Sequence, residues 1–392
     1  MILEWGSKKL NSEKLIPFVF LGFIFYSIFE GVFRYIFLIS GVGFLGYFIK
    51  FIMFSFICIK INPYITKKVI LTFFIILIFL LYGFYKNGLS SSVISLFVFI
   101  PLLYFYIYPA FTTLENVHLK LLYIFQILIV IGLIFDYFMA LPWVGYSGFV
   151  NGVEVSSGLQ WWSNGQERLL GFGRSSYETA TLLSFLCLIS LQRNSLLLKI
   201  LLITISLFGV YLTTSKGALM ALLFASLFYF IPKNHLYLKT FLIIISILLG
   251  NLILLVTILN LNVDFLKDIY FSLYERIEFM WPSTINKITN EGGLLGLGLG
   301  GIGVADENNI WKAVDNFWLY LIAMFGYFVW VVFLIITLIA SPKISTSKYS
   351  QLYIFFFIYS LTNNMLESVF GQVIFSMLIF ELFSIIKINK HK

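Results

Sequence analysis

The chain has 392 residues, of which 60% are hydrophobic and only 11% are charged, and its mean hydropathy is +0.97. This composition excludes an ordinary soluble domain and predicts a polytopic integral membrane protein. The formal net charge of +8 does not indicate a nucleic-acid partner, because the cations stand at the ends of apolar segments, where they encode membrane topology.

Apolar runs bounded by charged residues, Pro, Asn or Gly predict about twelve transmembrane helices in an all-α membrane fold. The runs do not alternate between apolar and polar residues, which excludes a membrane β-barrel. Glu30 and Arg34 interrupt the first two runs, and as an i,i+4 pair they would neutralise each other. The predicted spans are 16–31, 35–59, 69–85, 92–109, 119–141, 176–192, 197–213, 217–231, 237–259, 316–340, 350–366 and 369–386.

The basic residues predict the orientation of these helices. If the N-terminus is cytoplasmic, most of the 26 basic residues fall on the cytoplasmic side, as the positive-inside rule requires. An even number of spans then places both termini in the cytoplasm of a multi-pass inner-membrane protein. The whole chain, 1–392, forms one membrane domain, and its two longest connections, 142–175 and 260–315, become extracytoplasmic loops.

The cysteines and histidines give no sign of a metal centre or cofactor. Cys58 and Cys187 lie inside apolar runs, where a thiol behaves as a small hydrophobic group. The histidines, His118, His235 and His391, are far apart in the sequence and form no ligand motif. We therefore expect no disulfide, no metal site and no cofactor.

Lys216 is a single cation between two long apolar runs, in the stretch "LTTSKGALMALLF". It falls on the outer side, so the positive-inside rule does not explain it. One alternative is a lysine that extends from a helix end toward the membrane surface. The other is an anion site, because Thr213, Thr214 and Ser215 supply hydroxyl groups and the next helix directs its N-terminal N–H groups to the same place.

Three outer-side arginines favour the anion site. Arg168 and Arg174 precede the sixth span, and Arg276 lies in the second long loop. Arginines that converge on one cleft bind phosphate bidentately and suit a diphosphate. The alternative is that each arginine forms a weak surface ion pair with a nearby acidic residue, the candidates being Glu154, Glu167, Glu275 and Glu278.

A glycine-rich run, "GLLGLGLGGIG", fits the dinucleotide-binding pattern at Gly296, Gly298 and Gly301. That pattern needs a preceding strand and a following helix in a βαβ unit, which an extracytoplasmic loop before a membrane span does not provide. We therefore reject a nucleotide site and interpret the run as a turn that allows close approach of the backbone to a lipid, a sugar or a neighbouring loop.

Four local patterns, in order, resemble the O-antigen polymerase and O-antigen ligase superfamily. The region from about Arg168 to Phe333 contains "RLLGFGRSSYETATLL", "TTSKGALMALLF", "RIEFMW…GLLGLGLGGIG" and "VDNFWLYLIAMFGYFVW". They are similar to an Arg-x-x-Gly segment before a span, a Ser-Arg-Gly-Ala motif, an Arg, Trp and Gly-x-Gly-x-Gly loop and a His/Asp-Asn helix start. The first 140 residues resemble the family only in hydropathy.

The resemblance implies a membrane glycosyltransferase with a GT-C-like architecture, which works on undecaprenyl-diphosphate-linked sugars at the periplasmic face. Lys216 takes the position of the motif arginine, and it keeps the charge but loses the bidentate fork. Arg276 takes the position of the long-loop arginine. Asp315 stands where ligases usually have histidine, which favours a polymerase and makes a carboxylate the candidate base.

Glycosyl transfer from a lipid diphosphate needs cations for the leaving group and a base for the attacking hydroxyl. The candidate cations are Arg276, Lys216 and one of Arg168 and Arg174. Asp315 is the candidate base, with Asn316 orienting the acceptor. The alternative role of Asp315 is to cap the next helix. Glu178 and Asp306 are the next candidate bases, and the side chains available to stack on sugars are Trp161, Trp162 and Trp281.

Other functional classes stay open. An O-antigen ligase or a peptidoglycan polymerase would use related chemistry. A flippase for lipid-linked oligosaccharides or a transporter would carry ionisable groups at mid-membrane and discontinuous helices in repeated halves. The expected partners are the lipid-linked oligosaccharides, membrane lipid and a chain-length regulator protein, and nucleic acid is not among them.

Overall fold

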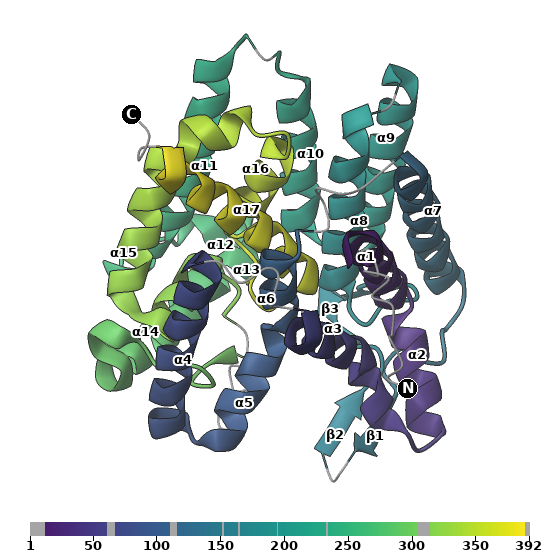
Figure 1. Cartoon of the computed structure of the whole chain (residues 1–392), viewed down its shortest axis with the longest axis horizontal. Helices are drawn as coiled ribbons and strands as arrows, with labels where there is room; N and C mark the ends of the chain where they lie inside the picture. The colour runs from purple at the N-terminus through teal and green to yellow at the C-terminus, as the bar shows by residue number, and fades with distance from the viewer. Residues whose placement is uncertain are drawn as a thin grey trace, which may run out of the picture. The chain divides into compact units, whose positions relative to one another are not determined.

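A computed structural model of the chain describes residues 12–60, 67–109, 116–150, 153–163, 165–193, 195–232, 234–303 and 314–388. Most of these residues are helical (Figure 1). The strands in this part of the chain are short and form two antiparallel hairpins in the first long connection. The all-α character predicted from composition is therefore confirmed.

The chain divides into two compact units, which we describe separately. The first unit draws on residues up to 65 and on 104–214. In it α7, α8 and α9 pack on one another, and α1 packs on α7 (Figure 1). Its helices and strands are α1 (Ser12–Ile28), α2 (Glu30–Ile39), η1 (Gly43–Tyr47), α3 (Phe48–Lys60), α7 (Asn116–Phe138), β1 (Ser147–Val150), β2 (Val153–Ser156), β3 (Trp162–Ser163), β4 (Gln166–Glu167), α8 (Ser176–Ser190), η4 (Leu191–Arg193) and α9 (Leu196–Leu212).

The second unit draws on residues 66–103 and 215–392, and α6 (Ile100–Ile107) crosses the division. Its centre is α16, which is almost entirely buried and contacts α10, α11, α15 and α17. Its helices are α4 (Lys67–Asn87), α5 (Leu89–Val98), α10 (Lys216–Phe230), α11 (Leu236–Ile258), α12 (Phe265–Ile269), α13 (Phe271–Glu275), η5 (Arg276–Met280), α14 (Trp281–Lys287), η6 (Ile288–Gly292), η7 (Gly293–Leu295), α15 (Phe317–Thr346), α16 (Ser350–Tyr359) and α17 (Val369–Ile388).

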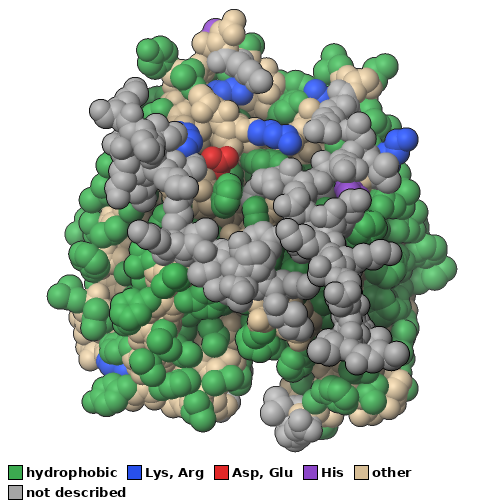
Figure 2. Space-filling model, viewed as in Figure 1, with side chains coloured by type: hydrophobic (Ala, Val, Ile, Leu, Met, Phe, Trp, Pro, Cys, Tyr) green, Lys and Arg blue, Asp and Glu red, His purple; other side chains and the backbone are tan. Residues whose placement is uncertain are grey.

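Helices occupy most of the predicted spans, and local sequence explains their ends. For example, α10 stops two residues before Pro232, and Thr214, with φ of +54°, separates α9 from α10. Four described helices, α4, α7, α11 and α15, are long and apolar enough to cross a membrane, and two bent pairs raise the number to six. Hydrophobic side chains dominate the face in Figure 2. The count of twelve spans and their orientation stay predictions.

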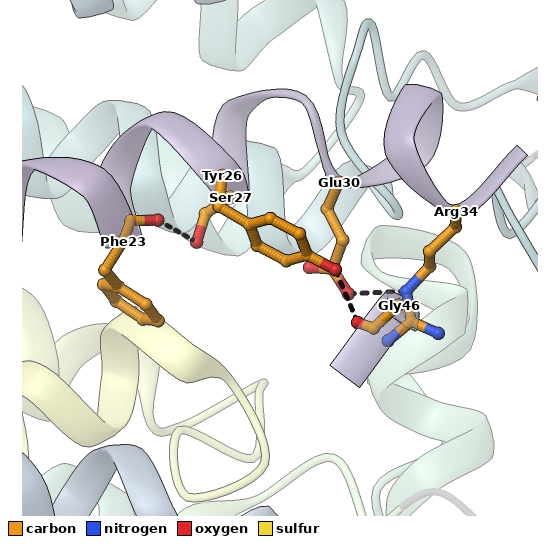
Figure 3. A network of polar contacts seen from close by, with 6 residues as sticks. All are labelled: Phe23, Tyr26, Ser27, Glu30, Arg34 and Gly46. Carbon is orange, nitrogen blue, oxygen red and sulfur yellow. Dashed lines mark hydrogen bonds and ion pairs between the residues drawn. The ribbon is translucent and has the colours of Figure 1, made fainter. Parts of the chain in front are cut away.

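The first bent pair explains the charged interruption of the first apolar runs. Helices α1 and α2 meet at Phe29 with an angle of 71°. Glu30 and Arg34 form the expected i,i+4 ion pair in the first turn of α2, with Nε of Arg34 2.8 Å from Oε1 of Glu30 (Figure 3). The second predicted span, 35–59, is wrong as a continuous helix, because α2 ends at Ile39 and η1 and α3 follow.

The glycine-rich run donates hydrogen bonds to backbone carbonyl groups at a break inside α15. Gly326 has φ of +85° and ψ of +169°, so the helix is interrupted there. The carbonyl groups of Ala323 and Met324 accept hydrogen bonds of 2.7 and 3.2 Å from the N–H groups of Leu297 and Gly298. No strand precedes this run, since η6 and η7 lead into it. Its backbone approaches the helix α15, and the predicted approach to a lipid, a sugar or a neighbouring loop stays a prediction.

Gly326→Ala should destabilise the protein markedly. The backbone conformation is one that only glycine adopts without strain, and an added Cβ would collide with the carbonyl oxygen of Leu294. We expect a loss of about 2 kcal/mol or more, measured as the thermal unfolding midpoint in detergent. Gly22→Ala is the matched control, because nothing lies within 4 Å of its added Cβ in α1. Equal midpoints for the two variants would contradict the proposed role of Gly326.

The predicted orientation has a direct test. Reporter fusions after Asn234 and Asn290 should report opposite compartments, the first cytoplasmic and the second extracytoplasmic. One predicted transmembrane helix, 237–259, separates the two positions in the topology that the basic residues predict. Alkaline phosphatase, which is active only outside the cytoplasm, and a fluorescent protein, which matures inside, give complementary readouts. Two fusions on the same side would overturn the assignment of the outer loops.

Candidate functional site

Four of the predicted site residues belong to the second unit and three to the first. Lys216, Arg276, Asp315 and Asn316 lie in the second unit, at the starts of α10, η5 and α15. The remaining three, Arg168, Arg174 and Glu178, lie in the first unit, in the loop before α8 and in its first turn.

The turn after α16 holds the N-terminus of α10. Tyr359, the last residue of α16, is buried, and its hydroxyl lies 3.3 Å from Oγ of Ser215. Asn363 donates a hydrogen bond of 2.6 Å to the same hydroxyl. A side chain at Gly217 would collide with Oγ1 of Thr362, so the first turn of α10 packs tightly on this turn.

The same turn also holds the N-terminus of α15. Asn316 is fully buried and donates to the carbonyl of Leu361 at 3.1 Å, while the N–H of Phe317 donates to the carbonyl of Ser360 at 3.1 Å. Oδ1 of Asn316 accepts the N–H of Leu319 at 2.9 Å, which makes Asn316 the N-cap of α15. Two helix N-termini, one with Lys216 and one with Asp315, therefore converge on one turn.

Asp315 is not the helix cap, and its carboxylate pairs with an arginine instead. Nη2 of Arg276 lies 3.0 Å from Oδ2 of Asp315, and the two side chains are 16% and 31% exposed. The structure thus brings together the two residues that the sequence singles out as catalytic. Arg276 does not pair with Glu275 or Glu278, which were its alternative partners.

Arg276 lies in a helical segment, and Tyr270, the residue before that segment, contacts Lys216. Residues 271–292 form short α-helical and π-helical pieces, and Arg276 begins the first π-helical piece. π-helical turns occur frequently at functional sites. Tyr270, just before this segment, has its ring 5.8 Å from Nζ of the exposed Lys216, in a cation–π contact.

The site in the second unit combines two cations, one carboxylate and two helix N-termini. The cations and the N–H dipoles suit an anion, and the partly exposed carboxylate can accept a proton or orient a cation. Among the residues that the structure describes, no three His, Cys, Asp or Glu side chains are grouped as they would be around a metal ion. Asp306, a further candidate base, lies outside the described residues.

The three predicted residues of the first unit, Arg168, Arg174 and Glu178, differ in their polar partners. Neither Arg168 nor Arg174 pairs with an acidic residue within the described ranges, and Nε of each is buried without a hydrogen-bond partner there. Their alternative partners bond elsewhere, since Glu154 accepts from Ser147 and Glu167 from Gln160. Glu178 interacts electrostatically with Lys50.

The tryptophans differ in whether they can meet a sugar. Trp281 is fully buried, so its faces are covered by protein and the expectation that it stacks on a sugar is wrong. Trp161 and Trp162 are 46% and 61% exposed and keep free faces. Tyr270, Tyr359, Thr362 and Asn363 were missed from sequence, although the polar run "TNN" inside an apolar segment was a usable signal.

No family model, characterised protein or solved structure matches the chain in the three comparisons that were made.

Proposed function

We propose that the chain polymerises undecaprenyl-diphosphate-linked oligosaccharide repeat units into a surface polysaccharide, by metal-independent glycosyl transfer at the outer face of the membrane. The observation that carries this proposal is the contact between Arg276 and Asp315 beside the start of α15. A cation and a carboxylate in contact and partly exposed, in the same unit as Lys216, are the groups that this transfer needs.

The ion pair suggests how the substrate activates the base. A diphosphate carries more negative charge than one carboxylate, so it competes for the guanidinium of Arg276. As Arg276 turns to the diphosphate, its ion pair with Asp315 breaks, and the carboxylate can turn toward a hydroxyl group. The order of binding then couples recognition of the leaving group to the release of the base.

The transfer step follows from these positions. The acceptor hydroxyl attacks the anomeric carbon, Asp315 takes the hydroxyl proton, and the bond from that carbon to the diphosphate oxygen breaks. The diphosphate leaves with the bonding electron pair, and Arg276 and Lys216 balance its charge. Asn316 supports the step indirectly, since its buried side chain fixes the start of α15 and hence the place of Asp315.

A second candidate function is a flippase for lipid-linked oligosaccharides or another transporter. The observation in its favour is the presence of discontinuous helices, at Phe29 between α1 and α2 and at Gly326 inside α15. Transporters build binding sites from such breaks. Against it, Asp136 in the apolar helix α7 has a structural use, because its carboxylate accepts the N–H groups of Leu170 and Gly171 at 2.8 and 2.9 Å.

Loss of the encoding gene, followed by electrophoresis of the surface polysaccharide, separates these functions. A polymerase predicts a surface product with a single repeat unit, because the units are still made and exported but are not joined. Unsubstituted lipid core would indicate a ligase, and lipid-linked units retained on the cytoplasmic side would indicate a flippase. Unchanged polysaccharide would contradict all three functions.

Asp315→Asn should abolish polymer formation and leave the fold intact. The amide cannot take the hydroxyl proton, and base catalysis contributes about 10²–10⁴-fold in rate. The cap of α15 belongs to Asn316, so thermal stability should stay near that of the wild type. The assay is polymer length made by purified protein in lipid vesicles.

The matched control for this variant is Glu275→Gln, which removes one negative charge from an exposed residue beside Arg276. It should retain activity. If Asp315→Asn polymerised as fast as Glu275→Gln, the carboxylate would have no part in proton transfer.

A further inference from the structure

The break between α1 and α2 in the first unit lies against the loop that precedes α8. The N–H of Gly31 donates to the carbonyl of Phe172 at 3.1 Å, and a side chain at Gly31 would collide with the carbonyl of Gly173. Only glycine allows this approach. The first turn of α2 and the residues just before α8 are therefore in direct contact.

Arg34, one turn after Gly31, is buried with an unused hydrogen-bond donor. Its side chain is 4% exposed, and Nε donates to Glu30 (Figure 3). The guanidinium lies 4.9 Å from the ring centre of Tyr47. Nη1 has no hydrogen-bond partner among the described residues. Burying a charged donor without a hydrogen-bond partner costs folding free energy. Such a donor therefore indicates a place where a bound ligand supplies the acceptor.

Two further unused donors stand on the other side of the contact. Arg174 follows Gly173, and its Nε is buried without a partner within the described chain. Ser175 is 1% exposed, and its Oγ likewise has none, although Ser175 occupies the N-cap position of α8. The 15-residue helix α8 adds the positive end of its dipole at this point.

The charges around these donors favour an anion. Glu30 interacts electrostatically with Arg34, Arg174 and Lys50, and Lys50 also interacts with Glu178. Three cations therefore act on Glu30, and a bound anion would lie in the same positive field. Tyr26, whose hydroxyl donates to the carbonyl of Gly46, adjoins the same cluster (Figure 3).

We propose that Arg34, Arg174 and Ser175 form an oxyanion site in the first unit, which binds a phosphate or carboxylate group. These residues belong to the first unit, whereas Arg276 and Asp315 belong to the second, and the proposal does not depend on the polymerase function. The phosphate of a lipid is the favoured source, because α1 and α2 expose large apolar side chains, among them Phe18, Phe25, Ile36 and Ile39. A free or sugar-borne oxyanion is the other source.

Binding to the full-length protein in detergent tests the site. The probe is fluorescent phosphatidic acid, with diacylglycerol, inorganic diphosphate and glucuronate as competitors. All measurements use a background with Arg276→Gln and Lys216→Gln, so that both cations of the proposed active site are removed and failure of one site is distinguishable from failure of the other. Arg174→Gln should weaken binding by about tenfold or more, because it removes a charged donor.

Glu30→Gln gives the opposite sign and a check on folding. Gln keeps the acceptor for Nε of Arg34 but removes a negative charge, so the affinity for the probe should rise, which a purely structural role of the pair would not cause. The control is Lys120→Gln, which removes an exposed cation from α7 in the same unit and should leave affinity unchanged.

The competitors identify the source of the anion. Competition by diphosphate or glucuronate at low concentration would support a soluble oxyanion, whereas their failure, with binding of phosphatidic acid intact, would support a lipid phosphate. Equal competition by diacylglycerol, or equal affinities for Arg174→Gln and Lys120→Gln, would overturn the site.

Discussion

The constraint on which this structure depends is that backbone polar groups in apolar surroundings need partners. Continuous helices meet it on their own, but the described part of this chain interrupts three apolar helical segments, between α1 and α2, between α5 and α6 and inside α15, and a long connection lies against the first and the third. At the start of α2 a loop carbonyl, that of Phe172, accepts the N–H of Gly31. At the break in α15 the loop N–H groups of Leu297 and Gly298 satisfy the freed carbonyls of Ala323 and Met324. In each unit a long connection is therefore held by hydrogen bonds to the interrupted helix. Each of these connections also contains an arginine of a proposed site, Arg174 in the first and Arg276 in the second.

Sequence reasoning located the helices well, because long apolar runs and their charged ends determine where a membrane helix can form. The ranges of α4, α7, α9 and α11 differ from prediction by a few residues. The helix breaks were harder to foresee. Gly326 stands in an unbroken apolar run, and its positive φ follows from tertiary contact with Leu294 and Leu295, which hydropathy does not report. The span predicted for 350–366 fails for a related reason, since its polar end forms the turn that holds α10 and α15.

The candidate site shows the same division between local and long-range information. Sequence identified Arg276 and Asp315 as separate candidates, because each residue type matches a chemical task. Their contact could not be inferred, since the residues between them include the glycine-rich run and its path is set by α4, α5 and α15. From sequence, the capping role was assigned as an alternative to Asp315 alone, and Asn316 was expected to orient the acceptor. In the structure Asn316 caps α15, because its uncharged amide can be buried at lower cost than a carboxylate. The carboxylate of Asp315 pairs with Arg276 instead.

Two arginine–carboxylate pairs in the described part of the chain differ in how far they are exposed, and exposure decides what each pair can do. Arg34 and Glu30 are 4% and 17% exposed, whereas Arg276 and Asp315 are 16% and 31% exposed. Separating a buried pair leaves an uncompensated charge and is strongly unfavourable, whereas a more hydrated pair exchanges partners at lower cost. The pair of the second unit therefore suits a reaction in which an incoming anion takes the arginine and releases the carboxylate. The pair of the first unit suits a fixed site, in which Glu30 holds one edge of the guanidinium of Arg34 and the edge at Nη1 stays available to a ligand.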